Sequence, residues 1–288
     1  MFIRLCKLVF SVAEASFRDD FLGKAAEMAF YSIFAFFPFL VFMVALYSAF
    51  GTEELVTQIL NYFSVIIPSD VHNYIIVMLR EILHSTNATV ASFTFIIAMA
   101  VASNAMFTFI KGLNKAYHVE ETRPLWYTRL LSVILLFVTA FVIFLGINAL
   151  VFGKIIFNFI LSFGILPKQT VYFISFIRWP IIFLALYAVI FTNYYLMPNI
   201  HYNPKAKFFS TIPGTFFFCF AWIISSWLFS VYLNHFNMYS KLYGALAVFA
   251  IFLIWLYYTS FIVLLGGEVN SKFYDKLKDE ERMLNTII

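Results

Sequence analysis

Six long apolar stretches constrain the fold of this chain more than any other feature of its sequence. Each is at least 22 residues long, and four of them contain no charged side chain. A helix needs about 20 residues to cross a hydrocarbon core of about 30 Å. The stretches are 25–50, 89–110, 130–152, 170–197, 208–233 and 242–267. The sequence therefore predicts an all-α polytopic membrane protein, a bundle of about six transmembrane helices with additional amphipathic helices.

Composition supports a membrane environment rather than water. Hydrophobic side chains make up 63% of the chain and charged ones 12%, whereas soluble domains have roughly 45–50% and about 25%. The stretches lack the alternation of apolar and polar residues that is typical of strands in membrane barrels, so helices are the expected form. The net charge of +4 is spread over short connections, which argues against a nucleic-acid-binding face. Membrane lipids are therefore the expected partners.

The distribution of Lys and Arg predicts the orientation of the bundle. Of the 19 basic residues, 14 lie on the side that carries both termini, 4 lie on the opposite side, and Arg178 lies inside a span. Short cytoplasmic segments are enriched in Lys and Arg. We therefore expect both termini in the cytoplasm and the protein in a bacterial inner membrane.

The segments between and beside the spans also have predicted forms. Residues 1–20 are expected to form an amphipathic helix on the inner membrane face, and residues 268–288 a charged cytoplasmic tail of the 1–267 membrane bundle. The outer connection 51–88 contains a further amphipathic helix. The apolar segment 155–166 is either interfacial or re-entrant. If it spanned the membrane with its neighbours, the count would be seven and the C-terminus would lie outside.

Arg178 is the most informative single residue of the sequence. An arginine inside a span costs at least about 2.5–3.5 kcal/mol unless something compensates it, and no Asp or Glu occurs between Glu121 and Glu268. An anionic ligand could supply the missing charge. The alternative is that Arg178 reaches a lipid phosphate or a backbone carbonyl in a purely structural role.

Neutral polar residues and prolines accompany this arginine. Candidate ligand-binding residues besides Arg178 are Asn104, Asn148, Ser225 and Ser226. Their alternative role is to form hydrogen bonds between helices. Prolines in two spans predict hinges, at Pro180 and at the pair Pro213 and Gly214.

Enzymatic motifs are missing from the sequence. It has no nucleophile motif, no phosphate-binding loop and no paired-carboxylate site, so no catalytic residue, cofactor or metal is predicted. The five histidines, among them His118, have no metal-ligand spacing. They are interpreted as solvated loop residues.

Short motifs stand in a fixed order along nearly the whole chain. They are Asp20, Ala25, Ala26, Tyr31, Pro38, 113–117, Arg123, Arg178, Trp179, 195–199, Pro213, Gly214, Tyr243, Gly244, 255–257 and 264–270. In this order they resemble the YihY/BrkB family of bacterial inner-membrane proteins. The resemblance implies six helices and cytoplasmic termini, and some family members are named as virulence factors. The family once carried a ribonuclease label, but the cytoplasmic loops offer no metal or acid–base group for a phosphodiesterase.

Two functions of different classes compete at this point. One is transport or flipping of a lipid-like or anionic amphiphile in envelope maintenance, suggested by Arg178 and the prolines. The other is a non-transporting scaffold or envelope-interaction protein that uses the outer amphipathic helix or the charged tail.

Overall fold

The computed structural model of the chain describes residues 10–12, 14–50, 88–163, 168–200, 203–235 and 238–287. Within these ranges all regular structure is helical, which confirms the predicted all-α class. The helices are α2 (Phe21–Phe50), α5 (Ala88–Ala116), α6 (Leu125–Phe163), α7 (Lys168–Leu196), α8 (Pro204–His235) and α9 (Met238–Ile287).

Side-chain caps fix where two of the helices begin. At the start of α2, Asp20 Oδ1 accepts a hydrogen bond from the Gly23 amide at 3.2 Å. At the start of α8, Asn203 Oδ1 accepts a hydrogen bond from the Lys205 amide at 2.9 Å, and Pro204 takes the first helical position. Both arrangements satisfy amide groups that have no partner inside the helix.

The end of α5 is closed by a Schellman motif with a histidine at its centre. The Val119 amide donates to the Asn114 carbonyl and the His118 amide to the Lys115 carbonyl, both at 3.0 Å. His118 has a φ of 52°, a left-handed conformation that glycine usually supplies at this position. A side chain that strains the backbone here points to a use for the imidazole.

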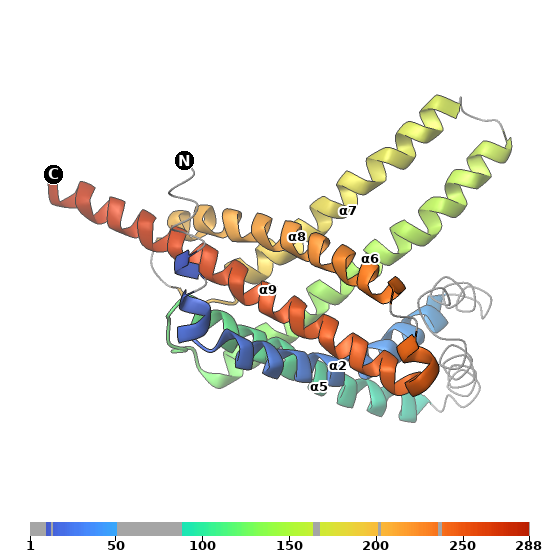
Figure 1. Cartoon of the computed structure of the whole chain (residues 1–288), viewed down its shortest axis with the longest axis horizontal. Coiled ribbons are helices and arrows are strands. Elements are labelled where there is room, and N and C mark those ends of the chain that lie inside the picture. The colour runs from blue at the N-terminus through green and yellow to red at the C-terminus, as the bar shows by residue number, and fades with distance from the viewer. Residues whose placement is uncertain are drawn as a thin grey trace.

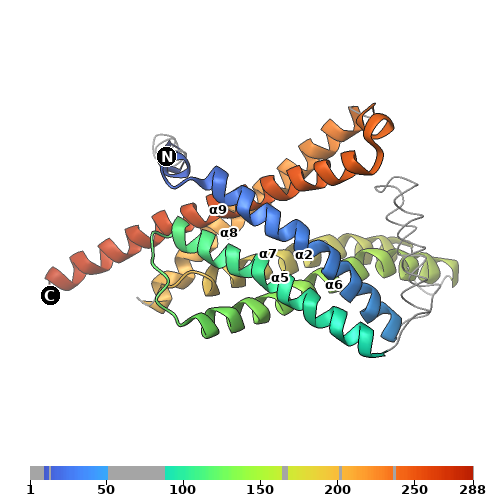
Figure 2. The same ribbon diagram turned by 90° about the horizontal axis from the view of Figure 1, so that it is seen from below.

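The helices form a packed group from which a hairpin diverges. In the described part of the chain, α2 packs along α5, α9 lies against α2 and α8, and α6 and α7 pack on each other. α6 also contacts α5, and α7 contacts α8. Figure 1 shows the α6–α7 hairpin running away from α2, α5 and α9 toward the upper right, and Figure 2 shows α2 and α5 side by side.

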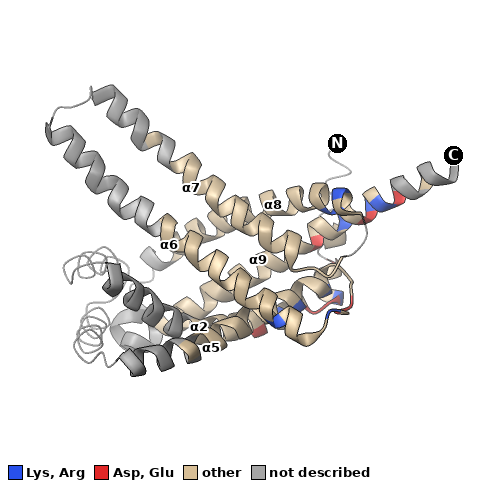
Figure 3. Ribbon diagram, turned by 180° about the vertical axis from the view of Figure 1, so that it is seen from behind, with Lys and Arg blue, Asp and Glu red and all other residues tan. Residues whose placement is uncertain are grey.

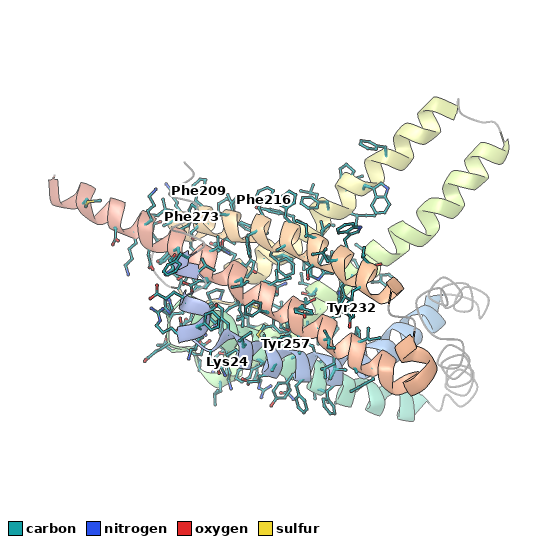
Figure 4. All side chains as sticks on the ribbon, viewed as in Figure 1. Lys24, Phe209, Phe216, Tyr232, Tyr257 and Phe273 are labelled. Atoms are coloured by element: carbon teal, nitrogen blue, oxygen red, sulfur yellow. The ribbon has the colours of Figure 1, made fainter. Side chains whose placement is uncertain are left out.

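Large apolar side chains cover the outside of the described helices, as a hydrocarbon environment requires. On α8, for example, Phe209 and Phe216 are exposed and point away from α9 (Figure 4). Four described helical segments are long and apolar enough to cross a membrane, by length and composition. They are Leu125–Gly146, Trp179–Leu196, Pro204–Tyr232 and Phe249–Asp279. The predicted count of six spans stays a prediction.

Charged side chains gather at one end of the molecule. Figure 3 shows the described Lys, Arg, Asp and Glu residues at the end where both chain termini lie. The buried core also sits toward this end, because it combines Phe21 and Met28 of α2 with Leu113 of α5 and Leu264 of α9. The polar network described below is therefore built at the charged end of the bundle.

Some predicted segments differ from the helices that the structure contains. Residues 155–163 continue α6 as one 39-residue helix and do not form a separate segment, and the tail continues α9, which has 50 residues. Helix is present at 10–12 and 14–18 of the predicted N-terminal helix. The outer connection 51–87 and residues 164–166 lie outside the described residues.

Candidate functional site

Glycines let three helices, α5, α7 and α8, pack closely against the segment 266–270 of α9. A Cβ atom added at Gly266 would overlap the Tyr194 hydroxyl of α7, and one at Gly267 would lie 2.8 Å from Leu113 of α5. On α8, a Cβ at Gly214 would overlap the Gly266 carbonyl oxygen. Close backbone approach of this kind requires glycine. We call residues 266–270 the α9 hub.

Hydrogen bonds join α9 to two of its neighbours, one through the α9 hub and one just before it. Asn270, which is fully buried, accepts a hydrogen bond from the Gly214 amide through Oδ1 at 2.6 Å. Tyr194 donates its hydroxyl hydrogen to the Val263 carbonyl at 2.8 Å. The packing of α7 and α8 against α9 at this level is therefore fixed by polar contacts as well as by shape.

Three charged or titratable groups from distant parts of the sequence meet beside the hub. Glu268 is fully buried, and its Oε2 lies 3.7 Å from His118 Nε2. The other ring nitrogen of His118, Nδ1, lies 3.7 Å from Asp19 Oδ2. The group connects the segment before α2, the end of α5 and the middle of α9.

Two cations balance these carboxylates. Lys272 Nζ lies 3.2 Å from Glu268 Oε1, and Arg18 Nη2 lies 3.1 Å from Asp19 Oδ2. Arg18 also lies 3.3 Å from His118 Nε2. Asp19, His118 and Glu268 have the donor types and spacing of a metal site, but Arg18 and Lys272 already neutralise both carboxylates. We interpret the group as an ion-pair network that joins three segments.

Buried amides tie the connection after α5 to the connection between α7 and α8. Asn114 Oδ1 accepts a hydrogen bond from the Asn199 amide, and its Nδ2 donates to Glu121 Oε2, both at 2.8 Å. Asn199 in turn donates to the Glu120 carbonyl at 2.8 Å and to Thr122 Oγ1 at 2.9 Å. We call this set, together with Arg123, the loop clamp.

Arg123 closes the loop clamp and caps α7. Its guanidinium donates to Glu121 through Nε at 2.7 Å and Nη2 at 2.6 Å. It also donates to the carbonyls of Leu196 at 3.3 Å and Met197 at 2.8 Å, where the end of α7 leaves acceptors without helical partners. Burial alone would raise the pKa of the Glu121 carboxyl, but hydrogen bonds from Arg123 and Asn114 lower it below its ordinary value.

Tyr117 lies between the loop clamp and the α9 hub. It is almost fully buried, and burial raises the pKa of its phenol, with Asn270 and Thr211 as neighbours. The hydroxyl therefore keeps its hydrogen across the physiological pH range and can act as a donor.

The residues predicted to bind a ligand do not all fall in the described part. The structure describes the backbone at Arg178 and Asn148, which is helical, but not their side chains. Asn104 Oδ1 accepts a hydrogen bond from Arg129, and Ser226 Oγ accepts one from Trp255 at 3.4 Å. Ser225 is half-buried beside Ser226 on α8. A shared site for these residues stays a prediction.

The predicted hinges lie inside continuous helices. α7 runs through Pro180 and α8 through Pro213 without interruption, so neither proline creates a helix end. Gly214 has the packing role described above. Bending at these positions stays a prediction.

His118 is exposed, as expected of a solvated loop residue, but its imidazole also lies 3.7 Å from the carboxylates of Asp19 and Glu268, which the sequence did not predict. Glu268 was placed at the start of a charged tail, yet it is fully buried. Sequence separation hides this network, since His118 and Glu268 are 150 residues apart. The motif order that carried the family resemblance includes 113–117 and 264–270 and was the available signal.

Comparison with known proteins identifies the family. The family model described as "Virulence factor BrkB" matches residues 12–286. The chain belongs to the BrkB family. A ribonuclease-like protein, YfkH, of Bacillus subtilis is 32% identical over 262 residues, covering 90% of this chain and 92% of YfkH. No solved structure matches the chain.

Other BrkB relatives carry the name UPF0761 membrane protein. The relative from Pseudoalteromonas atlantica is 24% identical, and the match covers 88% of this chain and 81% of the relative. The relative from Delftia acidovorans is 26% identical over 88% of this chain and 59% of its own. Together with the apolar helices, the BrkB relatives establish a multi-pass bacterial membrane protein.

Proposed function

We propose that this BrkB protein lies in the bacterial cytoplasmic membrane with both termini in the cytoplasm and moves an anionic amphiphile across the bilayer. A phospholipid or an envelope precursor has the required chemistry, a phosphate group on apolar chains. The charged end of the described structure supports the orientation, because it carries both termini and most of the basic residues (Figure 3).

One observation carries the transport proposal. Arg178 lies on a part of α7 where the described neighbours Phe176, Trp179 and Ile181 are 69%, 58% and 59% exposed. In a membrane these side chains face hydrocarbon, while α6, α7 and α8 contain no Asp or Glu. A cation in such a segment needs an anion, and the phosphate of an amphiphile can supply it.

The arrangement of the hairpin supports movement of such a molecule. α6 and α7 diverge from α2, α5 and α9 at the end far from the termini (Figure 1). Described side chains on α6, such as Phe141 and Leu145, are exposed there. Acyl chains can therefore lie against the hairpin while the phosphate stays near α7.

The test is a lipid-movement assay in proteoliposomes. A fluorescent phosphatidylglycerol is reconstituted with wild type, Arg178→Ala or Arg178→Lys, and dithionite quenching reports its transfer between leaflets. We expect Arg178→Ala to lose the protein-dependent rate and Arg178→Lys to keep part of it. Lys168→Ala, also on α7, is the matched control and should transfer lipid at the wild-type rate. A wild-type rate for Arg178→Ala would exclude the role of Arg178.

A scaffold function is the second candidate, and the length of α9 favours it. The charged C-terminal part of α9 projects beyond the other helices (Figure 1), and Phe273 and Met283 are exposed on it. Crosslinking in cells should then recover one stable partner, which deletion of residues 276–288 should lose while lipid movement is unchanged.

A further inference from the structure

Two basic side chains of α5 and α6 share one aromatic ring at the charged end of the bundle. Lys111 Nζ lies 4.5 Å and the Arg129 guanidinium carbon 4.3 Å from the centre of the Phe107 ring. Each contact is a favourable cation–π interaction. The two cations are therefore held near each other, within the Debye length of about 10 Å at 0.1 M salt.

Neither cation has a carboxylate partner in the described part of the chain. The ion pairs there involve Arg18, Lys24, His118, Arg123 and Lys272. Within the described part of the chain, the side chain of Arg129 donates one hydrogen bond, to the neutral side-chain amide of Asn104. Two like charges that lie close together without an acid repel each other, and an anion beside both would relieve that repulsion.

The surroundings of the two cations match the headgroup level of a membrane. Leu125, Trp126 and Tyr127, in the first turn of α6, are 73%, 68% and 43% exposed. Exposed aromatic residues at a span end are typical of the membrane–water interface. The start of α6 also carries the positive end of the helix dipole.

We propose that Lys111, Arg129 and the exposed first turn of α6 bind the phosphate of an anionic phospholipid in the cytoplasmic leaflet. Phe107 holds both cations in place, and Trp126 lies beside the glycerol region of the lipid. The site is separate from Arg178 and does not depend on the transport proposal. A bound lipid would join α5 to α6 at the base of the diverging hairpin.

The experiment uses the full chain purified in a neutral detergent. Dioleoylphosphatidylglycerol is titrated into the protein, and bound lipid is measured by native mass spectrometry and by the shift in thermal unfolding midpoint. Dioleoylphosphatidylcholine and inorganic phosphate are titrated in parallel. We expect phosphatidylglycerol to bind more tightly than phosphatidylcholine and phosphate alone to produce no shift.

The variants test which residues are responsible. Lys111→Met with Arg129→Gln removes both charges and should weaken the apparent affinity for phosphatidylglycerol about 25-fold, since each basic residue near an anionic lipid contributes roughly fivefold. Lys115→Met, one turn further along α5, is the matched control and should leave the affinity unchanged. Lys111→Arg with Arg129→Lys keeps both charges and should retain most of the binding.

Several outcomes would overturn the proposal. For wild type, these are equal binding of the two lipids, or a shift of the unfolding midpoint by inorganic phosphate as large as that by phosphatidylglycerol. For the variants, they are wild-type affinity when both charges are removed, or loss of binding when both charges are kept. Arg178→Ala should bind phosphatidylglycerol at this site like wild type. Its behaviour separates this site from the proposed transport function.

Discussion

Substitution of Gly266 by Ala tests whether close packing at the α9 hub holds α7 and α8 against α9. A Cβ at this position would overlap the Tyr194 hydroxyl and lie 3.0 Å from the Gly214 carbonyl oxygen. Tyr194 cannot easily move aside, because it is almost fully buried, donates to the Val263 carbonyl at 2.8 Å and contacts the Phe218 ring.

The magnitude follows from three contributions. Overpacking costs about 1–3 kcal/mol, and loss of the Tyr194 hydrogen bond costs about 0.5–1.5 kcal/mol. Replacing glycine by alanine inside a helix returns about 1 kcal/mol. We therefore expect Gly266→Ala to lower the free energy of unfolding by about 0.5–3.5 kcal/mol. Tyr194→Phe removes the overlapping hydroxyl, so adding it to Gly266→Ala should recover part of this loss.

Intrinsic tryptophan fluorescence during thermal unfolding in detergent measures these differences. The matched control is Gly146→Ala in α6, where a Cβ would meet nothing within 4 Å, so stability should stay the same or rise by up to about 1 kcal/mol. Equal midpoints for Gly266→Ala and Gly146→Ala would refute the packing argument. Additive effects of Gly266→Ala and Tyr194→Phe would refute the overlap with the hydroxyl.

Three further predictions concern the polar contacts at the charged end. Asn114→Ala removes two hydrogen bonds of the loop clamp and should lower the free energy of unfolding by about 2–4 kcal/mol. Asn203→Ala removes only a helix cap and should lower it by about 1 kcal/mol. Similar thermal unfolding midpoints for the two variants would contradict this. Lys272→Met leaves the buried Glu268 carboxylate without its cation, so it should destabilise more than Lys272→Met combined with Glu268→Gln, and a double-mutant cycle measures the coupling. Because the pKa of Glu121 is below its ordinary value of 4.5 in the folded chain, its stabilisation is present above pH 4.5 and is lost as the pH falls through the lowered pKa. Wild type should therefore lose more stability than Glu121→Gln on acidification. If the thermal unfolding midpoints of the two proteins fell in parallel with pH, the prediction would be wrong.

Hydropathy predicts apolar stretches, but it does not predict where the helices that contain them end. The second apolar stretch was predicted to end at residue 110, whereas α5 continues to Ala116. The intervening Lys111 and Lys115 end the apolar run without ending the helix. Helical hydrogen bonding stops only where His118 takes the left-handed conformation, and a hydropathy average carries no signal for that conformation.

The site at the charged end could be predicted only in outline. The motifs 113–117 and 264–270 indicated which residues mark the family, but not that Glu268 would be buried beside His118. Burial of a carboxylate depends on which helices pack around it, and that packing is a property of the whole bundle. The short polar residues of the loop clamp have the same difficulty, because an asparagine such as Asn114 at the end of an apolar stretch also suits an exposed loop.

The distribution of polar contacts indicates where the molecule can change shape. The loop clamp holds the bases of α6 and α7 through Asn114, Asn199 and Arg123. Hydrogen bonds to Val263 and Asn270 of α9 hold α7 and α8. Toward the other end, described side chains such as Phe141 on α6 and Trp179 on α7 are exposed. Separating the bases would break several buried hydrogen bonds, whereas moving the arms exchanges apolar contacts with lipid, which have little directional preference. Any rearrangement that serves transport should therefore pivot the α6–α7 hairpin about the loop clamp.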